Sequence, residues 1–235
     1  MISYLLNPKL IIRENLSFSG YVFNLIKAFL LAFFCIGISG IFINFVDNSI
    51  SSLMRIPSIL ATFRANNGKL KIIYGEQAFF IIAILGPIVE ELIFRLHLSL
   101  KTDHVSFSIA LFVYIIIGGS FIKFELLNIW FYLKIIFSIS SFFLMVKIFK
   151  NNSLLDQIKQ KYFSKYFYVS AILFGLIHIS NSEHINFLIL PVYLIYVLPQ
   201  IIMGLILGGV RIKMGLIFSI FLHIIFNTFF FINNN

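Results

Sequence analysis

Apolar runs of about 20 residues recur along this sequence, and they constrain the fold more than any other feature. A transmembrane α-helix needs about 20 mostly apolar residues to cross the hydrocarbon core of a bilayer. We therefore predict an all-α fold, a polytopic transmembrane helical bundle of about seven spans. The candidate spans are residues 18–46, 77–100, 104–122, 126–149, 166–180, 187–210 and 214–232.

The composition places most of this chain in lipid. Hydrophobic residues make up 60% of the 235 positions, charged residues make up 11%, and the mean hydropathy is +1.00. A soluble domain carries about 25% charged residues, so one water-soluble core could not hide this much apolar surface. Neither a repeat nor a low-complexity tract marks a second unit. We expect residues 1–235 to form a single integral membrane domain.

The net charge of +9 points to lipid headgroups, because the basic residues are scattered through short connectors. We expect the lipid bilayer as a partner and no nucleic acid. The positive-inside rule favours a cytoplasmic N-terminus, and the abundance of Ile, Phe, Asn and Lys suggests a bacterial cytoplasmic membrane. Seven spans would place one group of basic residues on the N-terminal side (Lys9, Arg13, Lys101, Lys147, Lys150, Lys159, Lys161, Lys165, Arg211, Lys213) and a smaller group opposite (Arg55, Arg64, Lys69, Lys71, Lys123).

Two connectors stand out from the apolar spans. Residues 47–76 combine basic side chains with Ser, Asn and Gly, and this segment could hold an amphipathic helix at the membrane interface. Residues 150–165 form the other substantial polar stretch.

Three of the apolar spans contain polar side chains that are costly inside a bilayer. Insertion of one ionisable residue costs about 2.5–3.5 kcal/mol, so such residues are functional candidates. At a rise of about 1.5 Å per residue, all three clusters fall near the midplane. They are Glu90, Glu91 and Arg95 in the second span, His178 in the fifth, and His223 with Asn227 in the seventh.

Helix geometry separates the roles of the two acidic residues. Glu91 and Arg95 are four residues apart with the acid first, the favoured orientation for an ion pair. Glu90 lies about 100° around the helix from Glu91, so it must meet a different partner. His223 and Asn227 are also four residues apart, and they project from one face.

These clusters form three motifs in a fixed order: Glu90-Glu91-x-x-x-Arg95, Phe174-x-x-x-His178 and His223-x-x-x-Asn227. In these motifs the chain resembles the CPBP family of intramembrane proteases, which includes CAAX prenyl endopeptidases and bacterial Abi or bacteriocin-processing proteins. Two features depart from that family. Leu96 stands where members usually have Gly, and the interval between Glu90 and His178 is longer than usual.

The resemblance implies an intramembrane endopeptidase with a CAAX-protease-like core on helices at about 77–100, 166–180 and 214–232. Its substrate would be a peptide or a membrane protein. Glu90 and His178 would activate a water molecule, while His223 and Asn227 would stabilise the tetrahedral intermediate. Glu91 belongs to the same expected catalytic set, and Arg95 is expected to be its structural ion-pair partner.

The resemblance also raises the question of a metal. Glu90, His178 and His223 could hold Zn²⁺ and leave a position open for water, with Glu91 as a further ligand. Asn is a poor zinc ligand, and the sequence contains no H-E-x-x-H motif. Hydrolysis with zinc and hydrolysis without metal are both open.

Two other classes of function compete with the protease. An ion-coupled transporter could use the same glutamates and histidines as a proton relay, but the sequence shows none of the internal repeats that such carriers contain. A noncatalytic immunity or scaffold protein could keep the family fold, although the intact motifs argue against it.

Overall fold

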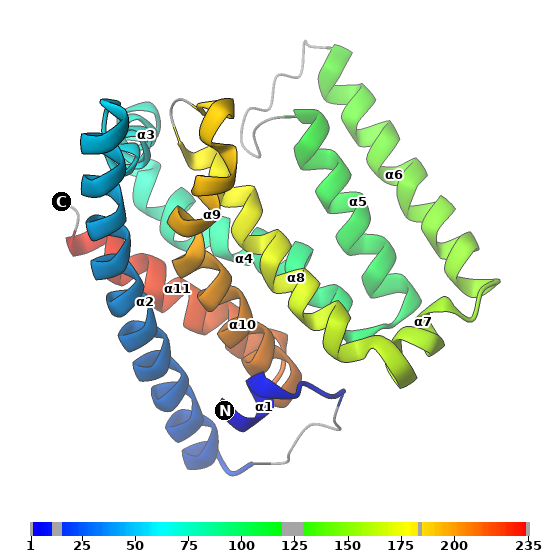
Figure 1. The fold of residues 1–235 in the computed structure, drawn as a ribbon. Coiled ribbons are helices and arrows are strands. Elements are labelled where there is room, and N and C mark those ends of the chain that lie inside the picture. The colour runs from blue at the N-terminus through cyan, green and yellow to red at the C-terminus, as the bar shows by residue number, and fades with distance from the viewer. Residues whose placement is uncertain (1, 11–15, 119–128, 183–184, 234–235) are drawn as a thin grey trace.

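The computed structural model describes residues 2–10, 16–118, 129–182 and 185–233. Within these ranges every regular element is a helix, and there is no strand (Figure 1). The predicted all-α class is therefore confirmed. The end of the predicted third span, the start of the fourth, and the basic residues Arg13 and Lys123 lie outside the described residues.

The structure contains α-helices and several short segments of two other helical types, which join or extend the α-helices. The 3₁₀ segments are η1 (Gly75–Gln77), η3 (Leu96–Ser99), η5 (His178–Asn181) and η6 (Phe187–Val192), and the π-helical turns are η2 (Phe80–Leu85) and η4 (Ile158–Tyr162). The α-helices are α1 (Ile2–Leu6), α2 (Phe18–Met54), α3 (Ile59–Tyr74), α4 (Gly86–Phe94), α5 (Thr102–Gly118), α6 (Ile129–Lys150), α7 (Leu154–Gln157), α8 (Phe163–Ile177), α9 (Tyr193–Tyr196), α10 (Leu198–Lys213) and α11 (Leu216–Asn233).

Several helices are long and apolar enough to cross a membrane. Four described segments qualify singly, namely Phe18–Met54, Ile129–Lys150, Leu154–Asn181 and Leu216–Asn233. A fifth candidate forms if the bent pair Ile189–Tyr196 and Leu198–Lys213 counts as one span. The chain is thus a polytopic integral membrane protein, while the number seven and the orientation stay predictions.

The predicted boundaries of two spans need correction. The first helix continues to Met54 instead of ending at residue 46, and the fifth begins near Leu154 instead of at residue 166. Residues 154–165, predicted as a polar connector, therefore extend a helix. Their basic side chains are long enough to reach water from a helix, because Lys can direct its ammonium group away from an apolar stem.

Two of the predicted spans depart from a regular α-helix near a proline. In the sixth, the segments Ile189–Tyr196 and Leu198–Lys213 meet at 48°; Pro199 lies in the first turn of α10, where its missing N–H is tolerated. In the second, the π-helical turn η2 leads into α4, which carries Pro87 in its first turn. Proline removes a hydrogen-bond donor and displaces the helical bonding pattern.

Figure 1 shows α5 and α6 side by side at one flank of the bundle, beyond α8. Helix α10 packs against both α8 and α2, and α11 packs against α4, η2 and α10. The three motif-bearing segments therefore belong to the packed core, and α5 and α6, which lie in the long interval between Glu90 and His178, pack together at its periphery.

Glycines on α10 allow its close approach to α8. A Cβ atom added to Gly204 would lie 2.9 Å from the carbonyl oxygen of Ala171 in α8 and 3.1 Å from its Cα. A Cβ atom on Gly208 would lie 2.8 Å from the ring of Phe167. Small residues at helix interfaces let backbones approach closely in membranes, so this packing positions the helix that carries His178.

We expect Gly204→Ala to lower the free energy of unfolding by about 1–3 kcal/mol, because overpacking forces a backbone shift. Thermal unfolding followed by circular dichroism in detergent measures the change. Gly37→Ala is the matched control: no heavy atom lies within 4 Å of a Cβ added there, so the higher helix propensity of alanine should leave stability equal or raised. Equal stability of the two variants would contradict this packing.

A buried carboxylate joins α2, α3 and α9. Asp47 accepts hydrogen bonds from the Ser58 hydroxyl at 2.6 Å, the Ile59 N–H at 2.9 Å, the Leu60 N–H at 3.2 Å and the Tyr196 hydroxyl at 2.7 Å. The sequence-based interpretation placed Asp47 in the connector, but it lies in α2 and is 4% exposed. Four donors offset the cost of burying its charge.

Candidate active site

Three side chains from three different elements converge on one another. Glu90 comes from α4, His178 begins η5 at the end of α8, and His223 comes from α11. The carboxylate oxygen Oε2 of Glu90 lies 3.6 Å from Nε2 of His223 and 3.9 Å from Nε2 of His178. The sequence-based expectation that Glu90 meets partners other than Arg95 agrees with this geometry.

Exposure distinguishes the two glutamates. The side chain of Glu90 is 28% exposed, whereas that of Glu91 is 0% exposed. Glu91 Oε1 lies 3.6 Å from Nε of Arg95, so the predicted ion pair forms, and it lies 3.1 Å from Nδ1 of His223. Glu91 therefore holds the buried side of the cluster, and Glu90 holds the side that is open to other molecules.

Hydrogen bonds at Nδ1 orient both histidine rings. Nδ1 of His178 lies 2.7 Å from the carbonyl oxygen of Phe174; a carbonyl only accepts, so Nδ1 carries the proton. Nδ1 of His223 faces Glu91 at 3.1 Å and donates to that carboxylate. In both rings Nε2 is the atom that remains to face Glu90.

The phenylalanine of the second motif packs at the centre of this cluster. The guanidinium of Arg95 lies 4.0 Å from the centroid of the Phe174 ring, a cation–π contact. The Phe174 ring also meets His178 and His223 edge to face, at centroid distances of 4.8 and 5.8 Å. Its carbonyl and its ring thus position three polar side chains at once.

The side-chain amide of Asn227 has a backbone partner in η2. It donates to the carbonyl oxygen of Ile82 at 3.2 Å. In the π-helical turn, the Gly86 N–H bonds to the Ile81 carbonyl, and the next donor in that pattern would be the N–H that Pro87 lacks. Asn227 therefore pairs a carbonyl exposed by Pro87 and joins α11 to η2. Its predicted part in catalysis stays a prediction.

We expect Asn227→Ala to lower the free energy of unfolding by about 1–3 kcal/mol, because it leaves the Ile82 carbonyl unpaired. The loss should be smaller in a Pro87→Ala background, where residue 87 regains an N–H. A double-mutant cycle of thermal stabilities measures this coupling. Asn233→Ala is the control, since Asn233 makes a similar amide-to-carbonyl bond at an exposed helix end. Strictly additive effects of the two changes would contradict the pairing.

Sequence reasoning missed one buried cation beside the site. Arg211 was counted among the connector residues, but it lies in α10, is 6% exposed and donates from Nε to the carbonyl oxygen of Arg95 at 3.1 Å. Its place at the end of an apolar run resembles that of a topology-determining residue. The contact with Arg95 arises only because α10 packs against η3, which begins directly after Arg95.

The expected zinc ligands do not form a complete ligand set as they stand. In the described part of the chain, no group of three His, Cys, Asp or Glu side chains is spaced to hold a metal ion. The Nδ1 bonds of the two histidines do match the outer-shell partners that metal-binding histidines use. Ligation of zinc by Glu90, His178 and His223 stays a prediction.

The fold and the cluster define a polytopic helical membrane protein with a Glu–His–His group from three separate helical elements. A sequence model of the family described as type II CAAX prenyl endopeptidase Rce1-like matches residues 77–229. The chain belongs to this family, and the match contains all three motifs. Neither a curated protein nor a solved structure matches the chain.

Proposed function

We propose that this protein is an intramembrane endopeptidase that hydrolyses a peptide bond in a membrane-associated substrate, with water activated by Glu90 and His178. One observation carries the proposal. Glu90 Oε2 is buried, has no hydrogen-bond partner among the described residues, and faces Nε2 of both His178 and His223.

The distances in this cluster suit a bridging water molecule. Separations of 3.6 and 3.9 Å exceed the 2.7–3.2 Å range of direct hydrogen bonds, and polar contacts of this length are commonly bridged by water. A water molecule can donate one hydrogen to Glu90 Oε2 and the other to Nε2 of His178. Such a water would be held by two acceptors and directed at a substrate carbonyl.

The hydrolytic step then balances on side chains of this chain. Glu90 takes a proton from the water as its oxygen bonds to the carbonyl carbon, and the carbonyl oxygen becomes an oxyanion. The Nε2–H group of a protonated His223 donates a hydrogen bond to that oxyanion and stabilises it. When the C–N bond breaks, the leaving nitrogen takes the proton from Glu90, which returns to its starting state.

The buried side of the cluster supports this step electrostatically. Glu91 lies between Arg95 and His223, so two carboxylates alternate with a guanidinium and an imidazole. A protonated His223 would make the four-residue group electrically neutral, which lowers the cost of burying charge. Glu91 thereby positions the His223 ring, with Nε2 turned toward Glu90.

The test is cleavage by the purified full-length protein in proteoliposomes. The probes are peptides with a farnesylated cysteine near the C-terminus, and unmodified apolar peptides, with products identified by mass spectrometry. We expect wild-type protein to cut at least one probe class and His178→Ala to abolish cleavage while keeping its thermal unfolding temperature. Cleavage that persists in folded His178→Ala would refute the mechanism. Uptake of protons or solutes without cleavage would favour the transporter.

Metal dependence needs its own measurement. If Glu90 and His178 activate water without zinc, activity should survive 1,10-phenanthroline, and metal analysis should find well below one zinc per protein. Loss of activity with the chelator, restored by added Zn²⁺, would instead favour the zinc site implied by the resemblance. Metal analysis of His178→Ala is a further test. If His178 is a zinc ligand, this variant should bind less zinc than the wild-type protein.

A further inference from the structure

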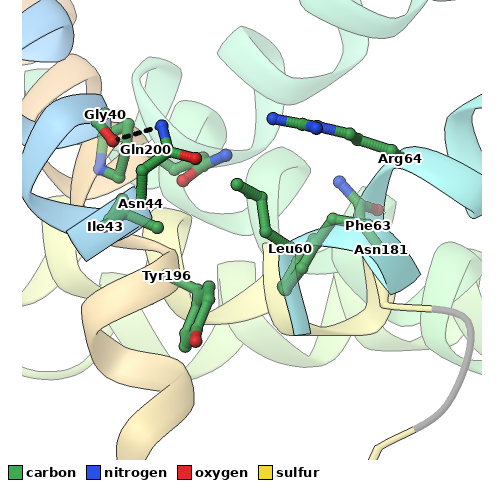
Figure 2. A pocket seen from close by; sticks show the side chains of 10 residues that line it. Gly40, Ile43, Asn44, Leu60, Phe63, Arg64, Asn181, Tyr196 and Gln200 are labelled. Atoms are coloured by element: carbon green, nitrogen blue, oxygen red, sulfur yellow. Dashed lines mark hydrogen bonds between the residues drawn. The ribbon is translucent and has the colours of Figure 1, made fainter. Parts of the chain in front are cut away.

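A second polar feature lies beyond the catalytic cluster, in a cavity of about 300 Å³ between α2, α3, η5 and the start of α10. Its walls contain three carboxamide side chains, Asn44, Asn181 and Gln200, and one cation, Arg64. Figure 2 shows Arg64 reaching from α3 across the cavity toward the wall that holds Asn44 and Gln200. The proposed mechanism uses none of these four residues.

The hydrogen-bonding capacity of this cavity is largely unused. Arg64 forms no ion pair with any carboxylate in the part of the chain that the structure describes. The side-chain oxygen of Gln200 is buried and has no partner there. The amide of Asn44 donates only to the carbonyl oxygen of Gly40, at 3.0 Å. The donors that this cavity offers to a planar anion are the guanidinium of Arg64 and the NH2 groups of Asn181 and Gln200. The Gln200 oxygen is an acceptor and would bind an N–H or O–H of the same ligand.

Two sets of hydrogen bonds hold the helices that form the cavity walls. Asp47 joins α2, α3 and α9 through its four hydrogen bonds, and its carboxylate is occupied by these donors and does not line the cavity. On the other side, the hydroxyl groups of Thr62 and Ser182 lie 2.7 Å apart and join α3 to the end of η5. The backbone of α3 is therefore held beside η5 by contacts that do not involve Arg64, and the Arg64 side chain itself is exposed at the cavity.

The same short helix connects the cavity to the catalytic cluster. His178 and Asn181 are the first and last residues of the 3₁₀ segment η5. Side chains three residues apart in a 3₁₀ helix lie on one face, separated by about 6 Å along its axis. An extended peptide advances about 3.3 Å per residue. A peptide with its scissile bond at His178 would therefore reach the cavity after about two or three residues.

We propose that Arg64 binds a carboxylate of the peptide substrate, two or three residues from the bond that is cut, in this carboxamide-lined cavity. The carboxylate is either the free C-terminus of the peptide or an acidic side chain near it, since both present the same planar anion. This inference rests on the proposed protease function, and it gives that function a specificity-determining residue outside the catalytic cluster.

Binding without turnover tests the inference. Full-length Glu90→Gln protein in detergent micelles is titrated with a fluorescein-labelled peptide carrying a farnesylated cysteine four residues from its end. The peptide is used as the free acid, as the C-terminal carboxamide, and as the carboxamide with a terminal glutamate. We expect the free acid to bind about tenfold more tightly than the carboxamide, and Arg64→Gln to remove this preference.

Two further variants keep the result interpretable. Arg64→Lys should retain part of the preference, because it keeps the charge without the fork of donors. Lys69→Gln removes a charge from the same helix outside the cavity and should retain all of it. A preference that survives Arg64→Gln, one that is lost in Lys69→Gln, or equal binding of acid and carboxamide to the starting protein would overturn the proposal.

The free-acid and glutamate peptides distinguish a C-terminal carboxylate from an acidic side chain. The use of an inactive variant separates this binding proposal from the proposed protease function. Recovery of tight binding by the glutamate peptide assigns the site to acidic side chains as well, whereas binding of the free acid alone assigns it to the C-terminus. Because binding is measured in a protein that does not turn over, failure of the wild-type protein to cleave would sink the protease and leave this binding result standing.

Discussion

Replacing Glu90 by glutamine is expected to lower kcat for peptide cleavage by about 10²–10⁴-fold, the usual contribution of a general base. Glutamine has nearly the shape of glutamate but cannot accept a proton from water. The substrate contacts outside the cluster are unchanged, so KM should change little. The variant should also fold, because the side chain of Glu90 is 28% exposed and is not the partner of Arg95.

A second carboxylate provides the matched control for this experiment. Glu76 lies in η1, directly before the same predicted span, and is exposed. Glu76→Gln makes the identical chemical change and should leave kcat unaffected. Single-turnover cleavage with excess enzyme measures the chemical step directly. Full activity in a folded Glu90→Gln protein would exclude Glu90 as the base and, with it, the water position proposed here.

Removing Arg95 is expected to destabilise the protein strongly without any direct effect on substrate contact. Arg95 is 1% exposed and its partner Glu91 is 0% exposed. Breaking a buried ion pair from one side typically costs about 3–5 kcal/mol, because the remaining charge is left uncompensated. Arg95→Met should therefore lower the free energy of unfolding by that amount, measured by thermal or denaturant unfolding in detergent.

The double variant distinguishes the lost charge balance from lost packing. In Glu91→Gln/Arg95→Met both charges are absent, so much of the stability should return. The exposed Arg55 at the end of α2 supplies the control Arg55→Gln, which should have little effect. An Arg95→Met protein as stable as the wild type, or a double variant no better than Arg95→Met, would show that the pair contributes little to the fold.

The different roles of the two adjacent glutamates could be predicted from helix geometry. An angle of about 100° between successive side chains separates Glu90 from Glu91, and a four-residue spacing brings Glu91 to Arg95. The structure reproduces both relations, because α4 is regular through Glu90 and Glu91, and the backbone N–H of Arg95, the residue after the helix, still donates to the Glu91 carbonyl at 2.9 Å. Local geometry sufficed here, since Arg95 directly follows the last residue of the helix that carries Glu91.

The prediction that Asp47 and Arg211 lie in connectors between spans is wrong. Both are charged residues near the ends of apolar runs, a pattern that is typical of membrane boundaries. The structure buries both, Asp47 against α3 and α9 and Arg211 against the carbonyl of Arg95. Their partners come from other helices, and the spacing along one helix carries no information about them.

The sequence by itself determined the membrane environment, the helical class and the residues that are costly inside lipid. The reason is that hydrocarbon thickness sets the length of an apolar run, and unpaired charge is expensive within it. Only tertiary structure decided which atoms face one another. The gap between Glu90 and the two histidines, the pairing of Asn227 with the Ile82 carbonyl, and the cavity around Arg64 each depend on the packing of separate helices.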